Sequence, residues 1–286
     1  MPQSGYPVRV IDAAITFEDY PMRSPLVLTG GTITEATEAR ATVTVEDERG
    51  GTATGRGTVF LSAIWAWPKS ELGFLTRVDA MQQMCIEIAD RMPVWCAEPR
   101  HPLEHGMDLH DRVDGLAIPV GLRLFITERI PTLAALVCWS PFDQALHDAY
   151  GRLLGISSYD ALSRELLPDD LSRWLGEVGE GRYLDEFIHR REREMLDAWL
   201  VVGTNDALRE GDAPDLGDGL PASVEGWIAR SGYRCFKLKT KGADGQAEAQ
   251  WVARVYREIV AIREQLGLEG PIRYEVDANE GCEGPW

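Results

Sequence analysis

The stretch Arg234-Cys-Phe-Lys-Leu-Lys-Thr240 decides the fold of the second half of the chain. Apolar and polar residues alternate in it, as in a strand with one buried face. A short apolar run at Trp199–Gly203 precedes it, and another at Ile272–Asp277 follows it. Helical patterns at 222–231 and 243–266 separate the three runs. The order strand, helix, strand, helix, strand predicts a parallel sheet with helical crossovers.

The first half of the chain predicts a smaller α+β domain. Three alternating segments predict an antiparallel meander: 8–15, 39–45 and 52–61. Between the first two, Thr16–Thr34 holds several Pro and Gly residues and is expected to be a long loop able to move. Helices are expected at Leu75–Met92 and at Pro131–Gly155, with Pro141 kinking or splitting the second. Residues 156–196 are charged and are expected to be helical.

The composition excludes several classes of protein. Asp and Glu number 46 against 29 Lys and Arg, for a net charge of −17, so neither nucleic acids nor anionic membranes are expected as partners. With 44% hydrophobic residues the chain can bury a substantial core. We find no secretory signal and no apolar run long enough to cross a bilayer. The five scattered cysteines form no Cys-x-x-Cys pair, which favours reduced thiols and a cytoplasmic protein.

Ionisable side chains lie at the ends of two successive strands of the predicted parallel sheet, where α/β units carry their functional groups. Lys237 and Lys239 are two residues apart and should project from one face, where two like charges lower the pKa of at least one of them. A lysine of lowered pKa can act as a general base. Asp277 offers a hard oxygen to Mg²⁺, and Asn279 can hydrogen-bond a substrate oxygen or a metal-bound water.

Together these groups fit the removal of a proton next to a carboxylate. A divalent metal on the carboxylate would stabilise the enediolate, and a neutral lysine would take the proton. Structural alternatives stay open. Lys237 and Lys239 can be surface residues of an edge strand, and Asp277 can cap a helix.

Two strand motifs resemble those of one enzyme family. Phe236-Lys-Leu-Lys-Thr240 resembles the K-x-K strand of the mandelate racemase/muconate lactonizing enzyme branch of the enolase superfamily. Val276-Asp-Ala-Asn279 resembles the D-A-N strand end of that branch, and the helix Phe142–Gly155 resembles the one that closes its N-terminal domain. The resemblance implies a Mg²⁺-dependent lyase or isomerase that acts on a small carboxylate and forms a homo-oligomer. Dehydration of a sugar acid is the first expectation, and racemisation or epimerisation the second.

The resemblance also implies roles for single residues. Lys239 would be the base, and Lys237 would lower its pKa or contact the substrate. Asp277 would bind Mg²⁺, and Asn279 would contact the substrate or a group bound to the metal.

Two loops of the capping domain would cover the active site in this family. One holds Tyr20, and the other, at Ser62–Trp67, holds Trp65 and Trp67. All three side chains are therefore expected to contact the substrate. Without the resemblance, plain packing is the preferred interpretation of the aromatic segment.

The family's fold divides the chain into an α+β capping domain at 1–155, a charged helical connection at 156–197 and the start of a (β/α)8 barrel at 198–286. A complete barrel takes about 250 residues, so the last part has room for only about three strands. We therefore expect an N-terminal fragment of a longer enzyme, inactive alone because the other metal ligands and a second acid or base are missing. The alternative from another class is a non-catalytic short paralogue that serves as a binding or oligomerisation module.

A further alternative is a zinc hydrolase. His101-Pro-Leu-Glu-His105 matches the H-x-x-E-H pattern, in which His101, Glu104 and His105 would share one helix face. Pro102 is tolerated only at a helix start, and Gly106 follows at once. A polar loop is the preferred interpretation of this segment.

Overall fold

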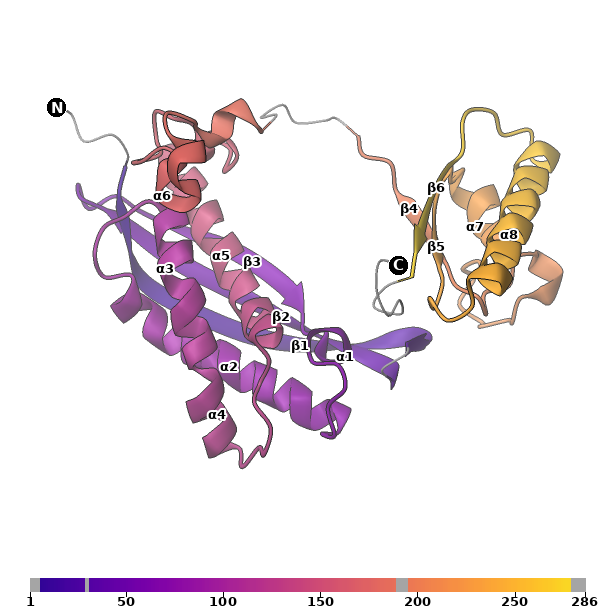
Figure 1. The fold of residues 1–286 in the computed structure, drawn as a ribbon, viewed down its shortest axis with the longest axis horizontal. Coiled ribbons are helices and arrows are strands. Elements are labelled where there is room, and N and C mark those ends of the chain that lie inside the picture. Colours follow the sequence, from indigo (N-terminus) through magenta and orange to yellow (C-terminus); the bar gives the residue numbers. More distant parts are fainter. Residues whose placement is uncertain (1–5, 29–30, 189–194, 279–286) are drawn as a thin grey trace. The chain divides into compact units, whose positions relative to one another are not determined.

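The computed structural model describes residues 6–28, 31–188 and 195–278. The chain divides into two compact units, residues 1–191 and 192–286, each with a hydrophobic core of its own (Figure 1). The finer domain boundaries that the sequence suggests, at 155 and 198, stay predictions.

The first unit is built on an antiparallel sheet in the order β1-β2-β3, with β1 (Val8–Leu28), β2 (Gly31–Asp47) and β3 (Thr52–Phe60). Alternate residues of β2 from Ala39 to Val45 are buried, because successive side chains of a strand point to opposite faces. The antiparallel meander expected from the sequence is confirmed.

The segment Thr16–Thr34 is not the long loop that its Pro and Gly residues suggested. In its described part, β1 runs on to Leu28 and pairs with β2 from Gly31, with a register shift between Pro21 and Leu26. Because β1 is an edge strand, a proline there can lack its N–H without breaking a ladder, and the register shift accommodates the unpaired residues.

The strands β1 and β2 extend beyond β3. β3 pairs with β2 only over Glu38–Glu46. Beyond it, residues 20–21 and 26–28 of β1 pair with residues 35–36 and 31–33 of β2. This two-stranded ribbon is visible as the end of the hairpin that projects past β3 (Figure 1).

Two long helices, α2 (Phe74–Trp95) and α5 (Thr132–Leu154), pack on the sheet of the first unit (Figure 1). Between and around them lie three shorter helices: α1 (Ala63–Ala66), α3 (Pro102–Gly115) and α4 (Ala117–Arg123). The core between helices and sheet is rich in Met, Ala, Val and Cys side chains. The segment at 101–105, expected to be a polar loop, is instead the start of α3, because Pro102 stands at a helix start, where proline is favoured.

Helix α5 begins after Pro131 and ends at Gly155, whose φ of +68° suits a glycine cap, as the sequence predicted. Pro141 does not split it. The carbonyl of Val137, which loses the N–H of residue 141, accepts a hydrogen bond of 2.9 Å from the Ser140 hydroxyl.

The strand β3 lies very close to α5 because two of its residues are glycines. A Cβ on Gly55 would stand 2.1 Å from the Ala145 carbonyl oxygen, and one on Gly57 would stand 2.0 Å from the Pro141 carbonyl oxygen. No side chain fits at either position, so the contact between strand and helix is a backbone contact.

Residues 156–188, in the stretch expected to be helical, form several short helical pieces joined by turns. The pieces are η1 (Asp160–Leu162), α6 (Ser172–Leu175), η2 (Gly176–Gly179) and η3 (Leu184–Glu186). Gly176 and Gly181 have φ of +64° and +68°, which ends each turn. Part of the charged run at its end, 189–194, lies outside the described residues.

The second unit has the predicted order. Its parallel sheet runs β4-β5-β6, with β4 (Trp199–Val202), β5 (Cys235–Lys239) and β6 (Arg273–Asp277), and the connections carry η4 (Glu210–Asp212), α7 (Val224–Ser231) and α8 (Gly245–Gln265). Phe236 and Leu238 of β5 are fully buried with apolar residues of α7 and α8. The fold class is thus an α+β unit followed by a three-stranded α/β unit. Among the described residues, no helix has the length and apolarity to span a membrane.

Candidate functional site

Four charged side chains form a ladder on the second unit's sheet. Lys237 lies in register with Glu275, and Lys239 with Asp277. The Lys237 Nζ atom is 2.9 Å from both Glu275 Oε1 and Asp277 Oδ2, and the Lys239 Nζ atom is 2.8 Å from Asp277 Oδ2. The expected convergence of two amines and one acid from neighbouring strands is therefore present.

The ladder occupies the face of β5 opposite the buried Phe236 and Leu238, as the alternation requires. The Lys237 and Lys239 side chains are 29% and 33% exposed, so each is partly sheltered. Because β5 lies between β4 and β6, the alternative of a lysine pair on an edge strand does not hold. The site is thus set by the central strand and its neighbour β6.

The charge state of Lys237 is set by the two carboxylates of β6. Its hydrogen bonds to Glu275 and then Asp277 hold the pKa of the Lys237 ammonium above its usual range. The two carboxylates outweigh the neighbouring ammonium because they stand in hydrogen-bond contact with Lys237. At neutral pH Lys237 is a cation.

Glu275 is the member of the ladder that the sequence reasoning missed. The signal was present, because Glu275 and Asp277 are two residues apart on one strand and share a face, as Lys237 and Lys239 do.

A magnesium site is not complete among the residues that the structure describes. Asp277 is the one ladder carboxylate at the strand end, and its Oδ2 atom already accepts from two ammonium groups. No group of three His, Cys, Asp or Glu side chains able to hold a metal occurs in the described ranges. Mg²⁺ needs near-octahedral oxygen coordination, so these residues do not fit it by themselves. Asn279, the expected substrate contact, lies outside the described residues.

The aromatic residues expected at the substrate belong to the first unit. Tyr20 lies on β1, accepts from the Arg40 guanidinium and packs edge-on against Phe60, with ring centroids 6.1 Å apart. Trp65 on α1 is 56% exposed, whereas Trp67 is 2% exposed and belongs to the core. Plain packing therefore accounts for Trp67, and exposure leaves Trp65 able to contact a ligand.

The H-x-x-E-H residues are used by the fold. The His101 Nδ1 atom accepts from the Leu103 N–H and caps α3, while Glu104 returns a capping contact to the His101 N–H. The His101 Nε2 atom lies 3.2 Å from the Ala161 carbonyl oxygen, and His105 Nε2 lies 2.9 Å from that of Val8. Each imidazole ring is thus hydrogen-bonded to a backbone carbonyl, which gives the motif a structural role.

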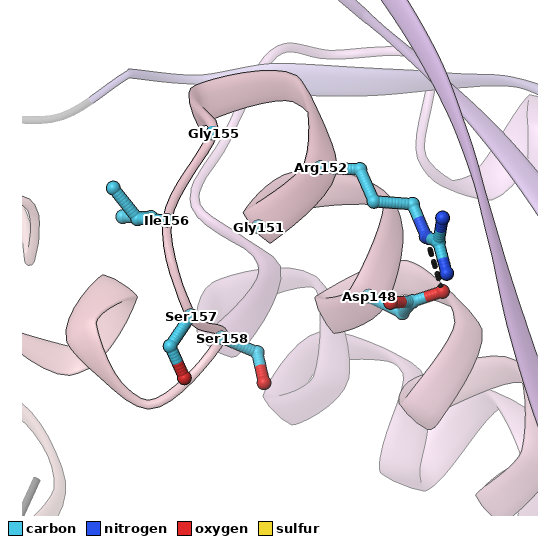
Figure 2. A pocket seen from close by; sticks show the side chains of 7 residues that line it. All are labelled: Asp148, Gly151, Arg152, Gly155, Ile156, Ser157 and Ser158. Atoms are coloured by element: carbon cyan, nitrogen blue, oxygen red, sulfur yellow. Dashed lines mark hydrogen bonds and ion pairs between the residues drawn. The ribbon is translucent and has the colours of Figure 1, made fainter. Parts of the chain in front are cut away.

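A hollow of about 320 Å³ lies at the end of α5 (Figure 2). None of the site residues predicted for the first unit lines it. Its lining consists of Asp148, Gly151, Arg152, Gly155, Ile156, Ser157 and Ser158. Asp148 accepts from Arg152 Nε at 2.8 Å and from the Arg56 N–H at 2.9 Å. Its one carboxylate is therefore already satisfied within the chain.

Comparison with known proteins finds similarity among solved structures. An enolase from Bradyrhizobium complexed with magnesium and mandelic acid is 16% identical, with a TM-score of 0.49, over 96% of this chain and 55% of that one. L-Talarate/galactarate dehydratase from Salmonella typhimurium LT2 is 17% identical, with a TM-score of 0.45, over 97% and 53%. A dipeptide epimerase from Methylococcus capsulatus, complexed with Mg and the dipeptide L-Arg-D-Lys, is 15% identical, with a TM-score of 0.45, over 96% and 55%.

The chain spans about half of the length of each of these structures. Protein-family models and curated proteins give no match.

Proposed function

We propose that this chain is part of a cytoplasmic enzyme that removes the proton next to the carboxylate of a small organic acid. Dehydration of a sugar acid is the first candidate reaction, and racemisation or epimerisation is the second. The observation that carries the proposal is the contact of Lys237, Lys239 and Asp277 on one face of neighbouring parallel strands. We propose neither a nucleic acid nor a membrane as a partner. We propose that the enzyme forms a homo-oligomer.

Lys239, nearest the carboxyl end of β5, is the proposed base. Lys237 is proposed to stay an ammonium, because Glu275 and Asp277 raise its pKa. A fixed cation beside the reacting carbon would stabilise the negative charge that develops as the proton leaves. Lys239 would thus accept the proton, and Lys237 would stabilise the negative charge.

The substrate contacts proposed from the resemblance are Asn279, Tyr20, Trp65 and Trp67. The burial of Trp67 supports a packing role for it and leaves Trp65 and Tyr20 as the stronger candidates of the first unit. Mg²⁺ bound through Asp277 belongs to the proposal by resemblance, and further ligands would have to complete the site. The chain of 286 residues alone is proposed to be inactive.

The test uses the whole protein encoded by the reading frame that contains these residues. Sugar acids are incubated with it in deuterium oxide and Mg²⁺, and exchange of the α-proton is followed by NMR. Lys239→Ala and the charge-keeping Lys239→Arg should both abolish exchange, while Lys237→Ala should slow it. Lys241→Ala is the matched control, because Lys241 is an exposed lysine just after the strand.

Retained exchange in both Lys239 variants would remove it as the base. If no acid exchanges in the whole protein while the ladder and the fold are intact, the non-catalytic alternative takes the place of the enzyme. Stoichiometric zinc that is lost in His101→Ala and His105→Ala would favour the hydrolase.

A further inference from the structure

A second hollow of the first unit, about 220 Å³ in volume, lies between the end of α2 and one face of α3. Three of its lining residues, His105, Asp108 and Arg112, come from α3. Their spacing of three and four residues puts them on the same side of that helix. The hollow is smaller than the roughly 300–1,000 Å³ of sites for drug-sized ligands, so its occupant would be a small metabolite.

His105 is a buried polar side chain with one ring nitrogen open to this hollow. It is 3% exposed, and its Nε2 atom donates to the Val8 carbonyl at 2.9 Å. Burial holds the pKa of the His105 ring below its usual range, so the ring is neutral at pH 7 and its Nδ1 atom is an acceptor. The Nδ1 atom bonds to no other described residue and is not among the fully buried polar atoms that lack a partner there, so it is reached from the hollow.

Charges of both signs line the hollow. Asp108 forms an ion pair with Arg100, so these two neutralise each other. The side chains of Arg112 and Glu98, in contrast, form no hydrogen bond or ion pair with another residue that the structure describes. One guanidinium and one carboxylate are therefore left to bind a ligand that carries both an anionic and a cationic group.

We propose that this hollow binds a free α-amino acid with an apolar side chain. The Arg112 guanidinium would bind the α-carboxylate through two parallel N–H donors. The α-ammonium group would donate to the Glu98 carboxylate and to the His105 Nδ1 atom. The apolar side chain would lie against Trp95 and Val94, the last two residues of α2, which also line the hollow.

Other small ligands match these groups less well. A simple anion would face the Glu98 carboxylate and the lone pair of His105, and a simple amine would leave Arg112 without an anion. A metal ion is not favoured either, because no three His, Cys, Asp or Glu side chains in the described ranges are arranged to hold one. None of the lining residues belongs to the ladder of the second unit, so the site is separate from the proposed catalytic one.

Isothermal titration calorimetry of the whole protein with L-leucine at pH 7 tests the proposal. L-Leucine should bind with a dissociation constant below about 1 mM. Two analogues each lack one of its charges: 4-methylpentanoate has no ammonium group, and 3-methylbutylamine has no carboxylate. Each should bind at least about tenfold more weakly than L-leucine, because one of the two open charges of the hollow stays unpaired.

Substitutions locate the binding site. Arg112→Gln and Glu98→Gln should each raise the dissociation constant for L-leucine at least about tenfold. Both side chains are exposed, so the variants should keep the circular dichroism spectrum of the wild type. Arg254→Gln is the matched control, because Arg254 is an exposed arginine of α8 in the second unit.

Absence of L-leucine binding up to about 10 mM, the concentration of a very weak ligand, overturns the proposal. So does an affinity that is unchanged in both Arg112→Gln and Glu98→Gln, or one that either analogue equals. A loss of binding in Lys239→Ala alone would place L-leucine at the ladder and would overturn it as well.

Discussion

The buried His101 makes the first unit sensitive to acid. Its side chain is 3% exposed, and burial lowers its pKa from 6.5 to about 4, although its hydrogen bond to the Ala161 carbonyl opposes the shift. In the unfolded chain the ring binds its proton near pH 6.5. The native state therefore holds fewer protons than the unfolded state between pH 6.5 and 4, and its stability falls as the pH falls through that window.

The size of the effect follows from the shift. The difference between the pKa of His101 in the unfolded and folded states corresponds to about 3 kcal/mol of unfolding free energy. About 2 kcal/mol of it is lost between pH 8 and pH 5. His101→Asn removes the titration and keeps a side-chain oxygen to cap α3 at the Leu103 N–H. Between pH 8 and pH 5 the free energy of unfolding of the variant should fall by about 2 kcal/mol less than that of the wild type. Any cost of the substitution that does not depend on pH cancels in this comparison.

Urea unfolding of both proteins at pH 8 and pH 5, followed by circular dichroism, measures this difference. Titrating carboxylates affect wild type and variant alike and cancel. His110→Asn, at an exposed histidine, should keep the wild-type loss. An equal loss of stability in wild type and His101→Asn would refute the reasoning.

Three further substitutions or reactions test other parts of the structure. Gly57→Ala should cost about 3 kcal/mol of unfolding free energy, because its Cβ would stand 2.0 Å from a backbone oxygen of α5, while Gly73→Ala, with no atom within 4 Å, should cost under about 1 kcal/mol in the same urea assay. Burial raises the pKa of the Cys96 thiol to about 12, so a disulfide reagent should fail to label it at pH 8 until urea unfolds the chain; rapid native labelling would contradict this. Glu275→Gln should lower the pKa of Lys237, as measured by NMR titration of its Cε resonance, and an unchanged pKa would show that Glu275 does not hold the proton there.

The second unit was predictable because its hydrophobic pattern and the order of its helices and strands indicate the same fold. Cys235–Lys239 alternates, helices separate it from both neighbouring strands, and no proline interrupts it. The first unit was less predictable because the effect of a Pro, Gly or His residue on secondary structure depends on its position in the fold. Proline and glycine at 16–34 suggested a loop, yet β1 is an edge strand that tolerates them. His101 is not among the usual helix caps, so the start of α3 gave a weak signal.

The site was predictable in position but not in charge balance. The two-residue period put Lys237 and Lys239 on one face, as observed. The expectation of a lowered pKa for at least one lysine did not include Glu275, which the register of β6 brings opposite Lys237 and which raises the pKa of Lys237. Strand register depends on tertiary pairing, which a single strand's sequence does not contain.

The ribbon formed by β1 and β2 beyond β3 has a consequence for how this protein can change. Its residues have strand neighbours on one side only, so adding or removing paired residues there would leave the helices and the buried core untouched. Tyr20 stands at its base. Natural variants of this chain can thus differ in the length of this arm at little cost to folding.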